Sequence, residues 1–201
     1  MNHKDRRQDI LIAAMELFAQ KGFRGTTTRD LAARAEVNEA IIFRHFSNKE
    51  ELYKAILEAK MRQGESSRSE ELKQLAESGD DVQFFEALGH TFLERHEHDT
   101  NFIRLLLFSA LEGHQLSDMF LDSMPERNPV AAYIQNRIEK GVFKPVDPYL
   151  AARALLGMFF MFVQSQELFG LKQKRSFDRK EVVQTFVSIF LTGIKTGSEN
   201  L

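Results

Sequence analysis

A short stretch near the N-terminus carries side chains with the chemistry needed to recognise DNA. Arg29 and Arg44 each have a planar guanidinium that can donate two hydrogen bonds to the O6 and N7 of a guanine. Thr27 and Lys49 stand at predicted helix N-termini, where backbone N–H groups and the helix dipole attract phosphate. Ile41 can touch a thymine methyl group. These residue types predict contacts to the bases and the backbone of duplex DNA.

The chain offers little for catalysis or metal binding. It has no cysteine, no Gly-x-Ser-x-Gly motif and no glycine-rich phosphate loop. The run His96-Glu97-His98-Asp99 is rich in metal ligands, but residues two apart do not share a helix face, and histidines at a helix C-terminus suit the dipole. A di-iron bundle needs paired Glu-x-x-His motifs, which the sequence lacks. We therefore expect no enzyme, no metal site and no cofactor.

Three short helices are expected to position the candidate DNA-binding residues. Apolar spacing predicts helices over 6–20, 28–35 and 39–45, with a tight turn of three residues between the second and third. Gly22 is a stop signal for the first helix. The other cap signals are Thr27 with Asp30, Asn38, and a capping box over Ser47-Asn48-Lys49-Glu50 that opens a fourth helix.

The packing expected of these helices is that of a helix-turn-helix. The small residues where its two helices cross are Ala32, Ala35 and Ala40. Val37 can fill the turn, while Ile42 and Phe46 can anchor the third helix from behind. The opposite face of that helix then points outward, as a recognition helix does when it enters the major groove.

The rest of the chain is also predicted to be helical. The expected helices cover residues 82–97, 100–112, 129–140, 148–169 and 179–195, after a polar segment at 64–81 that holds a loop and one short helix. No convincing alternating strand is found. The fold class is all-α, with an N-terminal three-helix helix-turn-helix domain at residues 1–47 and a larger helical ligand-binding and dimerisation domain at residues 48–201.

Charge and hydropathy indicate a cytoplasmic protein with no membrane segment. Residues 1–60 hold 11 Lys and Arg against 9 Asp and Glu, and residues 61–201 hold 16 against 20. The asymmetry has the sign expected of a DNA-binding head on an acidic body, but it is small. The charged N-terminus precedes no signal-peptide core, and the longest apolar run, 154–163, is too short to span a bilayer.

Residues 10–53 closely resemble the N-terminal signature of the TetR/AcrR family of transcriptional regulators. The matching stretches are Gly22-Phe23-Arg24-Gly25-Thr26-Thr27-Thr28-Arg29-Asp30-Leu31-Ala32, Ala35-Glu36-Val37-Asn38 and Ile42-Phe43-Arg44-His45-Phe46-Ser47-Asn48-Lys49-Glu50-Glu51-Leu52. The resemblance implies a homodimer, usually a repressor, that places two recognition helices in successive major grooves of a near-palindromic operator.

The resemblance also implies a role for individual residues. Those expected at the phosphate backbone are Thr27, Phe43, His45 and Lys49. Those expected to approach base edges are Arg29, Glu39, Ala40, Ile41 and Arg44, and Thr28 and Asn38 complete the predicted DNA-binding set. Two residues depart from the pattern. Glu36 replaces the usual turn glycine, and Phe43 replaces a frequent tyrosine, which removes one phosphate hydrogen bond.

The last two helices are expected to form the dimer. The helix that starts at Pro148 is apolar almost all round, which a helix wetted on one side does not need. Gly157 would let a neighbouring backbone approach closely. Together with the final helix it can form a four-helix bundle across a two-fold axis. The alternative is that both of its faces pack within one chain.

The body is further expected to hold a small, mostly apolar effector. The candidate pocket walls are Phe85, Leu88, Phe92, Phe102, Leu105, Leu106, Ser109, Met158, Phe159 and Phe162. Polar groups within reach are His90, Glu112, His114 and Gln164. Aromatic residues at helical spacing are also what an ordinary core contains. The alternative function is therefore a helix-turn-helix protein whose body binds a protein partner instead of a small molecule.

Overall fold

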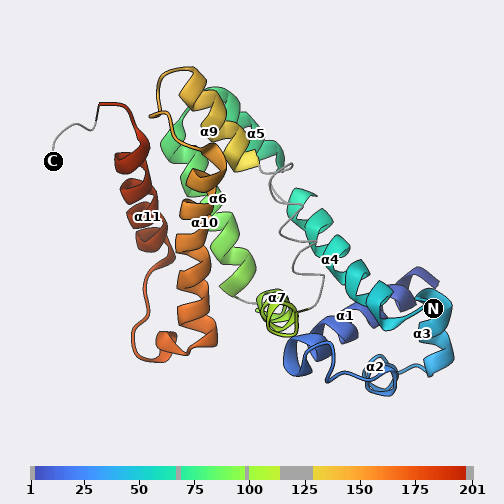
Figure 1. The fold of residues 1–201 in the computed structure, drawn as a ribbon. Coiled ribbons are helices and arrows are strands. Elements are labelled where there is room, and N and C mark those ends of the chain that lie inside the picture. The colour runs from blue at the N-terminus through green and yellow to red at the C-terminus, as the bar shows by residue number, and fades with distance from the viewer. Residues whose placement is uncertain (1–2, 67–68, 98–99, 114–128, 198–201) are drawn as a thin grey trace. The chain divides into compact units, whose positions relative to one another are not determined.

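The structure, a computed structural model, describes residues 3–66, 69–97, 100–113 and 129–197. Its helices are α1 (His3–Lys21), α2 (Thr28–Arg34), α3 (Glu39–His45), α4 (Lys49–Ser66), α5 (Ser69–Ser78), α6 (Asp81–Glu97), α7 (Asn101–Leu111), α9 (Pro129–Glu139), α10 (Pro148–Val163) and α11 (Arg179–Ile194) (Figure 1). Within these ranges the secondary structure is helical, apart from one isolated bridge between Phe143 and Lys195. The all-α prediction is confirmed.

The contacts divide the chain into two compact units. The first spans residues 1–67 and 100–123 and contains α1–α4 together with α7. The second spans residues 68–99 and 124–201 and contains α5, α6 and α9–α11. The predicted domain boundary at residue 47 falls within the first unit, because α4 packs on α1. As a functional division, that boundary stays a prediction.

Aromatic side chains form the core of the first unit. Phe18 and Tyr53 are fully buried, with their rings edge-to-face at a centroid distance of 4.8 Å, and Phe23 lies against both. The Tyr53 hydroxyl donates to the carbonyl of Leu105 at 3.0 Å and so ties α4 to α7. Burial raises the pKa of this phenol well above its usual value. Each buried ring adds roughly 2 kcal/mol of hydrophobic stabilisation.

The second unit combines an aromatic core with a buried carboxylate. Phe84 stacks on Tyr133 at 3.9 Å, and α6 lies between α5, α10 and α11. Asp81 is 5% exposed and accepts a hydrogen bond from the Tyr133 hydroxyl at 2.7 Å. The same carboxylate pairs with Arg137 Nε at 2.7 Å and with Lys195 Nζ at 3.4 Å. A buried charge needs such partners, because leaving it unpaired costs several kcal/mol.

The local signals that end and begin the short helices are mostly confirmed. Gly22 has φ +73° after α1, and the Asn38 side chain accepts from the Ile41 N–H at 3.0 Å at the start of α3. The capping box predicted over Ser47–Glu50 is wrong by one residue. Asn48 accepts from the Glu51 N–H, and the Glu51 carboxylate accepts from the Ser47 N–H and hydroxyl, all within 2.7 Å. The two hydrogen bonds from Ser47 lower the pKa of the Glu51 carboxyl group, and the bond from the Ser47 hydroxyl has the larger effect.

The long helix predicted over 148–169 ends earlier than expected. Asp147 caps it through the Leu150 N–H at 2.8 Å, with Pro148 in the first turn as predicted. The α-helix stops at Val163 and passes into one turn of π-helix, Gln164–Leu168. Such a turn changes the register of the hydrogen bonds, which apolar spacing alone does not reveal.

The helix-turn-helix turn contains a strained residue. Glu36 has φ +54° and is the one described non-glycine residue with a positive φ. The left-handed conformation costs a non-glycine residue on the order of 1 kcal/mol. The turn is held there by the Val37 N–H, which donates to the Ala32 carbonyl at 3.0 Å.

We expect Glu36→Gly to raise the free energy of unfolding by about 0.5–1 kcal/mol, because glycine adopts this conformation without strain. Denaturant unfolding would measure the change. Ala33→Gly, at an exposed position in α2 with ordinary helical geometry, is the matched control and should lower stability by a similar amount. A loss of stability in Glu36→Gly would contradict the interpretation.

Candidate nucleic-acid interface

The start of α2 is built by a reciprocal cap. The Asp30 N–H donates to the Thr27 hydroxyl oxygen at 3.1 Å, and the Asp30 carboxylate accepts from the Thr27 N–H at 3.0 Å and from its hydroxyl at 2.8 Å. These bonds, with Lys21 3.7 Å away, hold the pKa of Asp30 below its usual value. The cap fixes the direction in which α2 leaves the preceding loop.

Helix α3 buries one face and exposes the other. Ile42 and Phe46 are 3% and 1% exposed and anchor the helix in the core, as predicted. The exposed residues of α3 and its cap are Asn38, Glu39, Ala40, Phe43 and Arg44. Phe43 keeps 49% of its surface exposed. This outer face is the candidate recognition surface.

The structure brings most of the predicted DNA-binding residues to the surface. Thr27 and Arg29 on the α2 side are exposed, like the residues of the recognition surface. The side chains of Arg29 and Arg44 form no hydrogen bond or ion pair with the residues the structure describes, so both guanidinium groups can turn towards a ligand. Ile41 and His45 are half-buried, and Ile41 packs against the core. A thymine contact by Ile41 stays a prediction.

The ammonium group of Lys49 is already bonded within the protein and does not extend into solvent as a free phosphate-binding group would. Its ammonium donates to the carbonyls of Phe23 at 2.7 Å and Thr26 at 2.9 Å, and it lies 4.1 Å from the centre of the Phe23 ring. The positive charge of Lys49 is therefore directed at the loop between α1 and α2. The phosphate role that the resemblance implies for Lys49 stays a prediction.

Glu112 holds the same loop through its N–H groups. Its carboxylate accepts from the Phe23 N–H at 3.0 Å and from the Arg24 N–H at 3.2 Å. The contact is so close that a Cβ on Gly22 would lie 2.3 Å from a carboxylate oxygen of Glu112. Glu112 thus binds N–H groups of this loop, and Lys49 binds its carbonyl groups. We call these two residues the loop clamp. The sequence suggested Glu112 only as a polar group near a pocket.

The predicted effector-pocket residues fall in both units. Phe102, Leu105, Leu106 and Ser109 lie in the first unit, where the first three pack in its core. The members in the second unit are Phe85, Leu88, Phe92, Met158, Phe159 and Phe162. Phe85 and Phe159 are fully buried among other rings. His114 lies outside the described residues, and the pocket as a whole stays a prediction.

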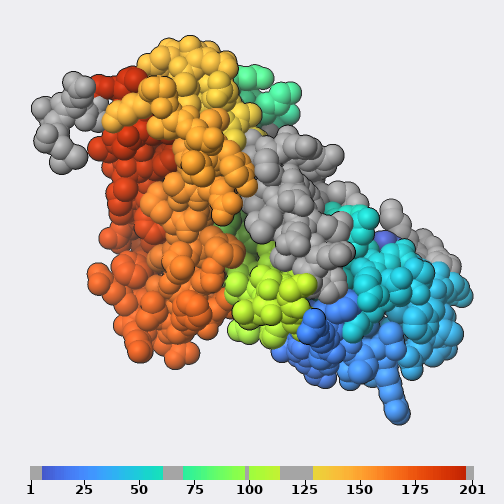
Figure 2. Space-filling model, viewed as in Figure 1, coloured from blue at the N-terminus to red at the C-terminus, as the bar shows by residue number. Residues whose placement is uncertain are grey.

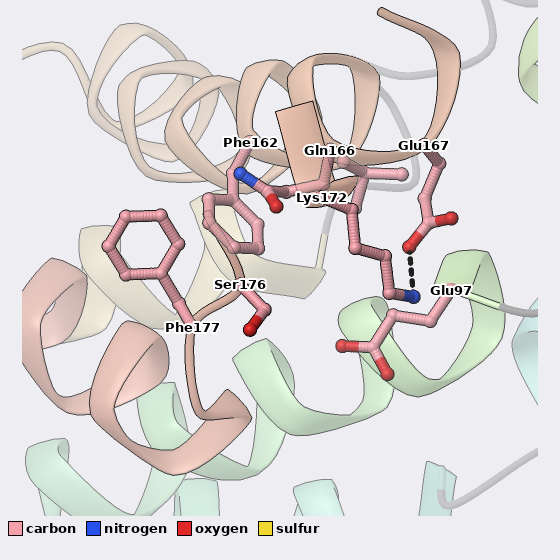
Figure 3. Close-up of a pocket in the computed structure, with 8 residues that line it drawn as sticks. Glu97, Phe162, Gln166, Glu167, Lys172, Ser176 and Phe177 are labelled. Carbon is pink, nitrogen blue, oxygen red and sulfur yellow. Dashed lines mark hydrogen bonds and ion pairs between the residues drawn. The ribbon is translucent and has the colours of Figure 1, made fainter. Parts of the chain in front are cut away.

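One small cavity lies beside the π-helical turn of the second unit (Figure 3). It has a volume of about 40 Å³, and Phe162 and Phe177 meet edge-to-face at its wall. Glu167 and Lys172 form an ion pair of 2.7 Å at its rim, as Figure 3 shows. Sites for small molecules usually measure at least about 300 Å³, so this cavity does not accommodate an effector of ordinary size.

Helices α10 and α11 leave an apolar stripe exposed on the second unit. Four residues of α10 share one face at helical spacing: Leu150, Ala154, Gly157 and Met161. Leu150 is 65% exposed and Met161 56%, and on α11 Ile189 is 59% exposed. A Cβ added to Gly157 or Gly193 would meet no atom within 4 Å. We call this surface the apolar stripe; it consists of Leu150, Ala154, Gly157 and Met161 of α10 and Ile189 and Gly193 of α11. Figure 2 shows α10, in orange, at the molecular surface.

The described ranges contain no candidate membrane span and no candidate metal site. No helix there has the length and apolar content to cross a bilayer. No three His, Cys, Asp or Glu side chains there lie close enough together to hold a metal ion.

Two family models match the chain. The model of bacterial regulatory proteins of the tetR family matches residues 10–56. The model of the AefR-like transcriptional repressor C-terminal domain matches residues 84–193, which is more than half of the chain. The protein therefore belongs to the TetR family of transcriptional regulators, and the resemblance found in the sequence is confirmed.

Known relatives and structures agree with this assignment. The HTH-type transcriptional regulator YvkB of Bacillus subtilis is 29% identical over 189 residues, which cover 92% of this chain and 95% of YvkB. AibR, solved with isovaleryl coenzyme A and operator DNA, has a TM-score of 0.72 at 20% identity, covering 92% of this chain and 97% of AibR. FadR of Bacillus subtilis, solved with stearoyl-CoA, has a TM-score of 0.74 at 19% identity, covering 92% of this chain and 98% of FadR. These structures show that the fold is shared.

We expect Glu112→Ala to lower the free energy of unfolding by about 1–2 kcal/mol, because it removes two charge-assisted hydrogen bonds from the loop between α1 and α2. Glu112→Gln keeps one acceptor and should lose less. Glu77→Ala, an exposed glutamate of α5, is the control and should change stability by less than about 0.5 kcal/mol. Equal midpoints for Glu112→Ala and Glu77→Ala in urea would show that the clamp contributes nothing.

Proposed function

We propose that the protein is a dimeric repressor that binds a near-palindromic operator and leaves it when a small, mostly apolar effector binds. The observation that carries the proposal is the exposed outer face of α3, which includes Glu39 and Arg44 and lies opposite a face anchored by Ile42 and Phe46. Arg29 of α2 is exposed as well. An α-helix fits the major groove, and side chains on its outer face reach base edges.

The apolar stripe supports dimer formation. Leu150, Met161 and Ile189 together expose apolar surface that a monomer would leave in water. Gly157 and Gly193 would allow the backbones of two copies to approach closely. A two-fold axis through such a stripe brings the same surface of both copies together. Two recognition helices related by this axis would read half-sites about 34–36 Å apart.

Repression and effector control rest on the family matches. The C-terminal match is to an AefR-like repressor domain, and two proteins of the same fold were solved with acyl-coenzyme A molecules. We therefore take acyl groups, supplied as acyl-CoA, as the first effectors to test. The acyl chain is the apolar part that suits the aromatic and aliphatic predicted pocket walls, and the charged coenzyme A group would have to lie outside them. In this proposal, ligand binding changes the spacing of the recognition helices until they no longer match the half-sites.

Met161→Lys is expected to break the dimer, because it would bury a charge in the apolar interface. Sedimentation should show a monomer, and affinity for a two-half-site operator should fall at least about tenfold, since each head then binds alone. Asn136→Lys, an exposed change on α9, is the control and should leave both values unchanged. A Met161→Lys protein that still sediments as a dimer would exclude the stripe as the interface.

Footprinting on the DNA beside the gene tests the function itself. We expect two protected patches one helical turn apart, and their loss on addition of stearoyl-CoA or isovaleryl-CoA. Arg44→Ala should lose the protection while remaining folded, because Arg44 is exposed and makes no described side-chain bond. Absence of any protected site would refute operator binding, and protection that neither acyl-CoA removes would refute this effector class.

A further inference from the structure

A hydrogen bond joins the first residues of the two helix-turn-helix helices. The Thr28 hydroxyl, at the start of α2, donates to Glu39 Oε2 at the start of α3, with an O–O distance of 2.6 Å. The other oxygen, Oε1, binds no group in the parts of the chain that the structure describes. Glu39 is exposed. A long side chain that would otherwise sample many rotamers is thus held by one oxygen, while its second oxygen stays available.

A carboxylate at this place can only accept hydrogen bonds, and that property restricts the bases it can face. In the major groove, guanine presents O6 and N7 and thymine presents O4, all of them acceptors. An acceptor facing an ionised carboxylate leaves a desolvated charge without a partner, which opposes binding. Only cytosine N4 and adenine N6 donate.

Cytosine is the better of these two partners. Adenine places its N7 acceptor beside the N6 amino group, so that a carboxylate near N6 is also repelled by N7. Cytosine presents the N4 amino group without a neighbouring acceptor on the same base. A fixed carboxylate therefore distinguishes cytosine from the other three bases.

We infer that Glu39, held by Thr28, selects a cytosine at one position of each operator half-site. The inference rests on the proposed function, and it adds the identity of one base and a positioning residue, Thr28. The Thr28 hydroxyl acts through Glu39, because its donated bond fixes the carboxylate before DNA arrives. The ordering of Glu39 then costs no further side-chain entropy on binding.

Selection from a random DNA pool, followed by sequencing, tests this inference on the full-length protein. The wild type should enrich a palindrome with cytosine at mirrored positions, preferred about tenfold over other bases. Glu39→Gln replaces the carboxylate by an amide of the same size, which can bind adenine N6 and N7 together. The preferred base at those positions should therefore change from cytosine to adenine, while the other positions keep theirs.

Variants of Thr28 separate positioning from direct contact. Thr28→Val keeps the shape and removes the donor, so the cytosine preference should fall several-fold without a change elsewhere in the site. Thr28→Ser retains the hydroxyl and should retain the preference. An identical preference in wild type and Thr28→Val would overturn the role of Thr28.

The pool experiment also separates failure of cytosine selection by Glu39 from failure of operator binding. A palindrome enriched equally by wild type and Glu39→Gln, with the same base at every position, would overturn the inference and leave operator binding intact. Enrichment of no sequence by the wild type would overturn the proposed function, and this inference with it.

Discussion

The geometry of the first unit depends on the electrostatic clamp on the loop between α1 and α2. Glu112 binds the N–H groups of that loop, and Lys49 binds its carbonyls. A loop held by opposite charges at its donors and acceptors has few alternative conformations, because moving it breaks charge-assisted bonds. The loop ends at Thr27, which caps α2, so the direction of α2 follows from the clamp.

The clamp also gives α7 a physical connection to the DNA-binding head. Glu112 is the C-terminal cap residue of α7. The Tyr53 hydroxyl of α4 donates to the carbonyl of Leu105, which also lies in α7. Two polar contacts of α7 with the head therefore accompany the apolar packing of α7 against α1. A displacement of α7 along its axis would therefore have to change both contacts.

Much of the fold, including the burial of the residues that anchor α3, followed from the sequence, because these signals are local. The limits of α2 and α3, the cap at Asn38 and the anchors Ile42 and Phe46 depend on residues within a few positions of one another. The cap of α4 was misplaced by one residue because Glu50 and Glu51 both stand at plausible spacing. Only the backbone geometry decides between them. The role of Glu112 could not be predicted, since its partners lie 88 and 89 residues away.

The buried carboxylate of the second unit has a consequence for how this body can change during evolution. Asp81 is shared by a phenol, a guanidinium and an ammonium that come from α9 and from the end of α11. Replacing Asp81 alone would strand Arg137 and Tyr133, and replacing a partner alone would weaken the support of a charge excluded from water. We therefore expect a substitution at one of these positions to be tolerated better when the others carry compensating substitutions. The residues that share this polar contact are thus expected to change together, whereas an apolar neighbour can be replaced alone where the new side chain keeps its volume.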